Sequence, residues 1–449
     1  MGFLFVPACG GKEVSGVVRS QGLGLKIIHL LKGLPDLVKR ERAAFLFTLS
    51  NILPSLMGIA IGPVILKIVG LEEYGTLGLA AYFLGLIVTY ADFGCYAHLL
   101  ASFSKKDPDK NSSLAISMLL KAILLLVALA IISALALKNN RHDDLYHLLD
   151  LFLIGAFLSP LNVDWFFIAR GRFGELFSAR LVQNAAYLGL VLIWHAVPRQ
   201  DSWILPIITG LSAAAGTGWL LKSLGIKKLQ SVYEAVRKVS LPAVWVHIKR
   251  LFPMAASQLV TPYFLGYALA WYSMCTPDKR LVGEFSIPYR LAIGFSSLVG
   301  PFVHFYMPRL VATGLIPLGK ILRLALSACL LFFITAIPLL WTYFRVAGIE
   351  MQRLPFAIQS FSILLLAVFF IAVRTAFVGQ TLLKGRYAVY FAIHASSCLP
   401  TLVLSWIARG TIPGEAVPWL ACLPDFLATL AFAWYYYIHS QRPAIAIRK

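Results

Sequence analysis

Long apolar stretches separated by short polar segments dominate the pattern of the chain. A helix that crosses a bilayer needs about 20 mostly apolar residues. Stretches of this kind lie at roughly 43–66, 75–100, 114–137, 146–168, 178–196, 203–221, 251–274, 282–308, 321–344, 355–378, 387–408 and 416–438. The pattern therefore predicts an all-α, polytopic membrane protein with about 12 transmembrane helices.

A basic segment divides these stretches into two sets of six. Leu229, Val232 and Val236 recur at helical spacing, and lysines occupy the other faces. This pattern predicts an amphipathic helix at the cytoplasmic membrane surface. The predicted organisation is an N-terminal basic, amphipathic segment, a first lobe, a cytoplasmic linker, a second lobe and a cytoplasmic tail, at residues 1–42, 43–224, 225–250, 251–438 and 439–449.

The second and eighth stretches repeat one another. They read "YGTLGLAAYFLGLIVTYADFG" from Tyr74 and "VGEFSIPYRLAIGFSSLVGPF" from Val282, which is 208 positions later. Each begins with an apolar or aromatic residue followed by Gly, and each has a Gly-rich middle. Parallel repeats of this sort build two-lobed transporters that hold the substrate between the lobes. We therefore expect two pseudo-symmetric six-helix lobes.

Composition agrees with this prediction and narrows the function. Charged residues make up 13% of the chain and the mean hydropathy is +0.78, whereas soluble domains carry about 25% charged residues. The formal net charge of +20 reflects cytoplasmic Lys and Arg or a cationic cavity, and we expect no nucleic-acid partner. Segments placed inside carry about three times as many Lys and Arg as those placed outside, which predicts that both termini are cytoplasmic.

Patterns typical of enzymes and metal sites are missing from the sequence. The six cysteines are scattered and form no CxxC pair, so neither a disulfide framework nor a metal site is expected. There is no HExxH or GxSxG motif. A membrane glycan polymerase or ligase, the enzyme alternative, would be expected to present a sizeable external domain. We therefore expect no catalytic residue and no cofactor.

Basic residues inside the apolar stretches are the candidate binding groups. An arginine at mid-membrane depth costs roughly 2.5–3.5 kcal/mol on insertion scales, and such residues often mark a substrate path. Arg290 lies well inside the eighth stretch, so we expect it to contact substrate, with a carboxylate pair as the alternative. Arg374, Arg180 and Lys67 lie nearer the ends of stretches. They are predicted to line the same cationic cavity, with anchoring at the membrane interface as the alternative.

Two carboxylates are predicted to act at a gate. Asp92 is expected to close a gate or to pair with a cation from the other lobe, and Glu284 is expected to form an ion pair. Lys121 is expected to reach the inner headgroups and is left out of the site. Histidines are scattered among the spans, so the sequence leaves open whether H⁺ or Na⁺ drives transport.

Several motifs resemble one family. "NILPSLMGIAIGPVILKIVGLEEYGTLGLAAYFLGLIVTYADFGCYAHLLASFSK" resembles the opening helix pair of Wzx-type O-antigen and polysaccharide flippases, which belong to the MATE-like exporter superfamily. "SPLNVDWFFIARGRF" resembles the end of the family's fourth span, and the eighth stretch resembles its eighth helix, whose basic residue is Arg290 here. Positions that match the first motif are Asn51, Gly70, Glu73, Tyr74, Gly75, Asp92, Phe93 and Gly94. After Trp165 the family tends to show Gln-Gly and an acidic residue, whereas this chain has Ile168, Ala169 and Gly171.

The resemblance implies a function. It implies that an oligosaccharide unit of O-antigen (lipopolysaccharide) or another surface polysaccharide, linked to undecaprenyl pyrophosphate, moves across the bacterial inner membrane by alternating access. Arg290 would then hold the diphosphate. The implied partners are this lipid-linked oligosaccharide, membrane lipids, and a polysaccharide polymerase or chain-length regulator. An ion-coupled exporter of small cationic drugs is the alternative, and its cavity should be acidic.

Overall fold

The computed structural model describes most of the chain, and every regular element in the described ranges is a helix. The described residues are 23–104, 110–138, 144–158, 161–197, 201–260, 264–312, 318–383, 386–407 and 412–440. The helices of the first half are α1 (Leu23–Val69), α2 (Leu71–Asp92), α3 (Cys95–Ser104), α4 (Lys110–Lys138), α5 (Asp144–Ala156), α6 (Asp164–Ala169), α7 (Phe173–Ala196) and α8 (Ile204–Leu224). Those that follow are α9 (Ile226–Arg237), α10 (Leu241–Val260), η3 (Leu265–Tyr267), α11 (Ala268–Cys275), α12 (Lys279–Ala312), α13 (Leu318–Ala347), η4 (Met351–Arg353), α14 (Leu354–Leu383), α15 (Tyr387–Ile407), η5 (Gly414–Ala416) and α16 (Val417–Ser440).

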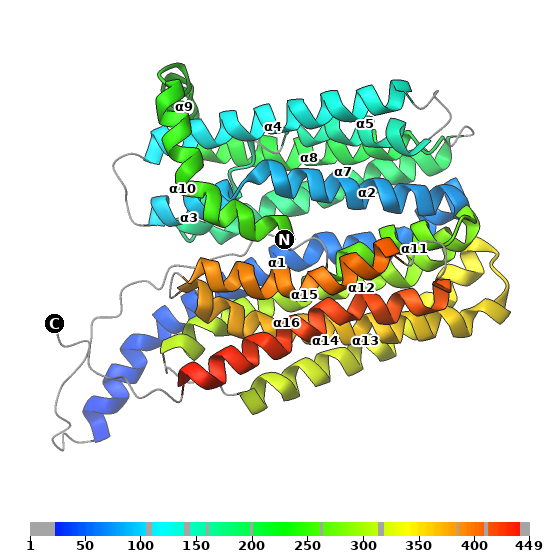
Figure 1. The fold of residues 1–449 in the computed structure, drawn as a ribbon. Helices are drawn as coiled ribbons and strands as arrows, with labels where there is room; N and C mark the ends of the chain where they lie inside the picture. The colour runs from blue at the N-terminus through cyan, green and yellow to red at the C-terminus, as the bar shows by residue number, and fades with distance from the viewer. Residues whose placement is uncertain are drawn as a thin grey trace.

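Two groups of helices lie side by side, as the sequence predicted (Figure 1). In the first group α2, α4, α5, α7 and α8 pack against one another, and in the second α12 to α16 do so. Helix α1 contacts α7 of the first group and both α12 and α13 of the second. Helices α2 and α12 also pack together, so the two repeated stretches form part of the contact between the groups.

Nine helices in the described ranges are long and apolar enough to cross a membrane. The other three of the twelve predicted spans do not correspond to any of these nine helices. The span predicted at 146–168 is divided between α5 and α6, and that at 251–274 is divided among α10, η3 and α11. The span at 282–308 lies within α12, one continuous helix of 34 residues that carries Glu284 and Arg290. The all-helical, multi-span fold is confirmed, while the count of twelve is not matched by twelve uninterrupted apolar helices.

The helix predicted at 75–100 is interrupted, which corrects the sequence prediction. Helix α2 ends at Asp92, and α3 begins at Cys95. Between them Phe93 has φ 48° and Gly94 has φ 76°. Gly adopts positive φ without steric cost, but an aromatic residue there is uncommon. Apolar side chains continue through the break, so hydropathy alone gives no sign of it.

The predicted linker contains two helices. Helix α9 forms where the apolar spacing predicted it and packs against α4, whereas α10 begins at Leu241, inside the predicted linker. On α10 the side chains of Trp245, Val246 and Phe252 are exposed, as expected for a helix beside lipid. The backbone from Leu23 already belongs to α1, while residues 1–22 and 441–449 of the two predicted terminal segments lie outside the described residues.

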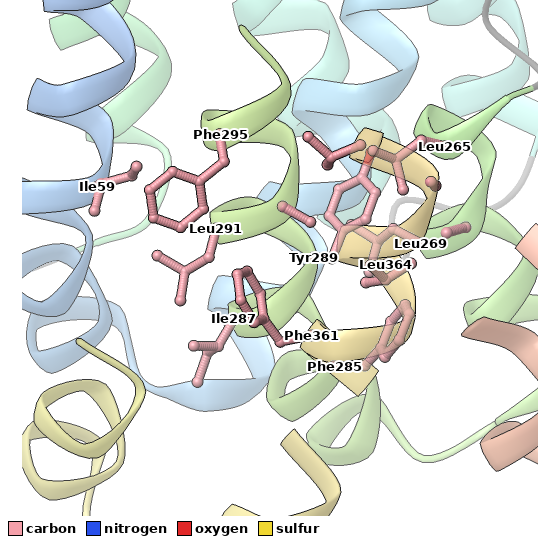
Figure 2. Packing of buried hydrophobic residues seen from close by; sticks show 14 of the residues in the cluster. Ile59, Leu265, Leu269, Phe285, Ile287, Tyr289, Leu291, Phe295, Phe361 and Leu364 are labelled. Carbon is pink, nitrogen blue, oxygen red and sulfur yellow. The ribbon is translucent and has the colours of Figure 1, made fainter. Parts of the chain in front are cut away.

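The largest buried cluster surrounds α12. Figure 2 shows Ile287, Leu291 and Phe295 projecting from this helix toward Ile59 and Phe361. Positions four apart share one helix face, so these side chains form a continuous apolar stripe. The ring centroids of Phe295 and Phe361 are 5.9 Å apart. This packing fixes α12 between its neighbours and thereby sets the position of Arg290, which lies beside the stripe on the same helix.

Candidate functional site

Arg290 projects from α12 toward the first lobe. Its guanidinium carbon lies 3.8 Å from the centroid of the Tyr74 ring, and its Nη2 donates a hydrogen bond to the Tyr74 carbonyl oxygen at 3.1 Å. The absence of a side chain at Gly78 leaves room for the guanidinium, because a Cβ there would lie 3.3 Å from Nη2. Tyr74 itself is fully buried. The contact joins α12 to α2, and therefore joins the two lobes.

The charge of Arg290 is not balanced by a carboxylate within the described ranges. A cation over an aromatic ring gains about 0.5–2 kcal/mol, less than the cost of a charge at membrane depth. Arginine has five N–H donors, and in the described structure only Nη2 has a hydrogen-bond acceptor. Arg290 is therefore a partly buried cation, and its remaining N–H donors have no acceptor within the described structure.

Small residues at the repeated positions bring the lobes into contact beside Arg290. A Cβ at Gly75 would lie 2.8 Å from the backbone nitrogen of Gly283, and a Cβ at Gly283 would lie 2.1 Å from the carbonyl oxygen of Leu71. These two glycines are the equivalent positions of the internal repeat. Their close approach packs the lobes together at the end where α2 begins.

We expect Gly283→Ala to loosen this contact. The added methyl group would overlap the Leu71 carbonyl, and overpacking of this kind typically costs 1–3 kcal/mol. Thermal unfolding of the purified protein in detergent should show a lower midpoint. The matched control is Gly58→Ala, where a Cβ meets nothing within 4 Å. Equal unfolding midpoints for the two variants would contradict this account of the lobe contact.

Arg374 lies within the second lobe and is paired. Its Nη1 is 3.0 Å from Oδ1 of Asp425, and both side chains are almost completely buried. The guanidinium carbon also lies 4.2 Å from the Phe264 ring centroid, and Asp425 Oδ2 accepts a hydrogen bond from the backbone N–H of Leu265 at 3.1 Å. This ion pair ties α14 and α16 to the start of η3, and it already compensates the charge of Arg374. Binding of substrate by Arg374 stays a prediction.

Arg180 and Lys67 differ from Arg290 in their surroundings. Arg180 on α7 pairs with Asp164 at the start of α6 and donates to Gln183 Oε1 at 2.8 Å. Lys67 is exposed in the last turn of α1, where a cation interacts favourably with the helix dipole. Their predicted roles in binding therefore also remain predictions, and the structure brings neither into contact with Arg290.

The two carboxylates predicted at a gate are both in ion pairs. Asp92 Oδ1 is 2.9 Å from Lys121 Nζ, so Lys121, which the sequence analysis assigned to the headgroups, instead pairs with Asp92 inside the same lobe. Glu284 accepts two hydrogen bonds of 2.8 Å from Arg353 and lies 3.8 Å from Arg280. Both pairs join helices within one lobe, whereas one of the two expectations for Asp92 was a pair with a cation of the other lobe. Gating stays a prediction for both carboxylates.

Two cavities lie within the first lobe. One has a volume of about 260 Å³ and is lined by residues of α2, α5, α6, α7 and α8, Asp164 and Arg180 among them. The other, of about 30 Å³, is lined by Asp92 and Lys121. Asn162 contributes to the walls of both. Arg180 is recognisable in the sequence as a charge near the end of an apolar stretch, but the cavity beside it is not, because packing between helices forms the cavity and hydropathy does not reveal it.

Comparisons with known proteins agree with this architecture. Residues 42–313 match the family described as "Polysaccharide biosynthesis protein". No curated protein sequence matches the chain. Among solved structures, a multidrug resistance MATE family transporter of the MOP superfamily matches in its inward-facing conformation, with TM-score 0.64, 14% identity, and coverage of 90% of this chain and 96% of that one.

Other members of this superfamily share the fold. An outward-facing MATE family transporter gives TM-score 0.61 at 16% identity and covers 89% of this chain and 95% of its own. A MOP superfamily transporter from Pyrococcus furiosus gives TM-score 0.54 at 13% identity with the same coverage. The reverse polarity of its binding pocket is described as suggesting a different function. The chain is therefore a multi-pass membrane protein with the MATE transporter fold, and it belongs to the polysaccharide biosynthesis protein family of Wzx-like flippases.

Proposed function

We propose that the protein translocates a lipid-linked oligosaccharide, a repeat unit of O-antigen or another surface polysaccharide on undecaprenyl pyrophosphate, across the bacterial inner membrane. The observation that carries the proposal is Arg290. This cation lies at the contact between the lobes, and no carboxylate pairs with it in the described part of the chain. The match to the polysaccharide biosynthesis family over residues 42–313 supports the same substrate class.

The chemistry of a diphosphate fits this site. A guanidinium can donate two parallel hydrogen bonds to phosphate oxygens, and charge-assisted bonds of this kind are about twice as strong as neutral ones. The negative headgroup would also compensate the charge that Arg290 carries at the lobe contact. Lipid tails can remain in the bilayer while the headgroup crosses, because only the headgroup needs a polar route.

Alternating access fits the lobe contact. Given cytoplasmic termini, the end that contains Gly75 and Gly283 would face outward, and their close contact would make this conformation closed on the outside. Rocking of the lobes about α1 would then open that end and close the other. Both an inward-facing and an outward-facing MATE transporter match the chain, which supports a fold that adopts both arrangements.

Export of small cationic drugs is the weaker alternative. A cavity for cations should present free carboxylates, yet Asp92, Asp164 and Asp425 each pair with a basic side chain. The reverse pocket polarity described for the Pyrococcus furiosus transporter is a precedent for a MOP superfamily member with another function. A cationic lobe contact therefore favours an anionic substrate.

Deletion of the gene tests the proposed function. We expect the strain to lose its surface polysaccharide and to accumulate the corresponding polyprenyl-diphosphate glycan on the inner leaflet, because the glycan is still made but is not moved. Mass spectrometry of extracted lipids measures the accumulation and identifies the sugars. A plasmid copy of the gene should reverse both effects. Unchanged polysaccharide and lipid pools, together with greater sensitivity to cationic drugs, would instead support the exporter alternative.

A further inference from the structure

The larger cavity of the first lobe has the features of a binding site. Its volume of about 260 Å³ is far above the roughly 10–15 Å³ that one water molecule needs. Phe152, Leu158 and Pro206 contribute apolar walls, and the polar lining comes from Asn162, Asp164, Arg180, Gln183, Thr209 and Thr217. Ligand sites commonly combine apolar walls with a few polar groups that fix orientation.

Asp164 supplies a buried acceptor at the wall of this cavity. The residue is 5% exposed, and its Oδ2 accepts a hydrogen bond from Arg180. Its Oδ1 is buried and accepts no hydrogen bond from the described protein. A buried polar group without a hydrogen-bond partner lowers the stability of the folded protein. A ligand that donates a hydrogen bond to this oxygen would remove that penalty.

The lining of the cavity also supplies hydrogen-bond donors. Asn162 uses its Oδ1 to accept the backbone N–H of Asp164 at 2.9 Å, which leaves its amide N–H groups to donate. Gln183 likewise uses Oε1 to accept a hydrogen bond from Arg180, so its amide nitrogen is also left to donate. The cavity therefore presents a buried carboxylate acceptor together with amide donors.

The charges decide which ligand class fits. Asp164 and Arg180 compensate each other, so the lining is close to neutral overall. A bare cation in the cavity would meet the guanidinium, and a bare anion would meet the carboxylate. A neutral hydroxyl group avoids both conflicts, because it donates to Asp164 and accepts from the amide donors. The apolar walls can pack against ring C–H groups, and the volume suits a single sugar ring better than an oligosaccharide.

We propose that this cavity binds one neutral sugar residue of the transported glycan. This inference rests on the proposed function and specifies the part of the substrate that the first lobe recognises. Arg180 and Tyr187 lie seven residues apart on α7, two turns or roughly 10 Å along the axis and on the same face. Tyr187 lies near enough to Arg290 for the two side chains to interact electrostatically. The geometry therefore places the sugar cavity about two helical turns along α7 from the region of the proposed diphosphate site.

Saturation-transfer NMR tests the proposal on the full chain in nanodiscs. The probes are unphosphorylated glucose, galactose, N-acetylglucosamine, N-acetylgalactosamine and rhamnose. We expect at least one of them to receive saturation from the protein. Ala213→Leu should fill the cavity, and Thr217→Val should remove a lining hydroxyl at constant size, and each should reduce the signal roughly fivefold or more. Ala185→Leu, at an exposed position on α7, is the matched control and should keep the signal.

Two results would overturn the proposal. They are the absence of transfer from the wild-type protein to any sugar and an undiminished signal in Ala213→Leu. If the first result came with thermal stabilisation by Na⁺ over K⁺, a cation would be the better candidate for the occupant. The sugar site and the proposed function can fail separately. If the purified protein binds sugar but deletion of its gene leaves polysaccharide export unchanged, only the proposed function fails.

Discussion

Replacing Arg290 by Gln is expected to abolish export of the lipid-linked glycan while the protein accumulates to normal levels. The substitution keeps a neutral, polar N–H donor and removes the cation over the Tyr74 ring. Loss of one partner of a buried, charge-assisted contact typically costs 2–5 kcal/mol, which corresponds to a decrease in affinity of roughly 30-fold or more. Arg290→Lys should retain partial activity, because it keeps the charge but lacks the planar fork of donors.

Two measurements check this result, and one substitution provides a matched control. Surface polysaccharide is quantified in the deletion strain that carries each variant, and binding of a short-chain prenyl diphosphate is measured with purified protein. Arg345 also lies over an aromatic ring, with its guanidinium carbon 4.8 Å from the Trp341 centroid, but it is exposed at the end of α13. Arg345→Gln should leave export unchanged. If Arg290→Gln exports normally at normal protein levels, the diphosphate assignment is wrong.

Arg374→Met is expected to destabilise the protein strongly. It would leave Asp425 buried without its cation, and breaking a buried pair in this way typically costs 3–5 kcal/mol. The double variant Arg374→Met with Asp425→Leu should recover much of the loss, because apolar replacement of an entire buried pair is often nearly neutral. Folded yield and thermal unfolding in detergent measure both effects.

A solvent-accessible ion pair is the control for this prediction. Arg172 and Glu175 are 2.7 Å apart, and each side chain is 36% exposed. Exposed pairs contribute about 0–1 kcal/mol, so Arg172→Met should change the unfolding midpoint only slightly. If Arg374→Met proved as mild as Arg172→Met, the pair with Asp425 would not stabilise the second lobe.

The sequence predicted the helical fold and marked Arg290 as a charge inside an apolar span, but it did not predict the partners of the charged residues. Arg290 stood out because an arginine in the middle of an apolar span needs an explanation that its own helix does not supply. Its neighbour Tyr74 lies on another helix, and the sequence of one span does not show which residues of another span it contacts. The internal repeat does carry information about one contact between helices, since it aligns Gly75 with Gly283, which meet in the structure.

The pairs of Arg374 with Asp425 and of Lys121 with Asp92 were not predicted for the same reason. Each pair joins two helices, and which faces of two spans meet depends on packing that neither span encodes alone. The breaks between α5 and α6 and between α10 and α11 have a different cause. Both breaks fall within stretches of about 23 residues that are mostly apolar, so length and composition predict one span in each case. Backbone geometry and interhelical contacts decide these features.

The position of α1 implies that the two halves of the chain are not independent. By sequence α1 belongs to the first six spans, yet Tyr343 of α13 donates a hydrogen bond to the Ile59 carbonyl of α1 at 3.0 Å, and Ser55 and Ser297 join α1 to α12. A gene split within the linker should therefore yield fragments that fold poorly when produced singly. Co-expression should restore assembly, because the C-terminal fragment uses a helix that only its complement can supply.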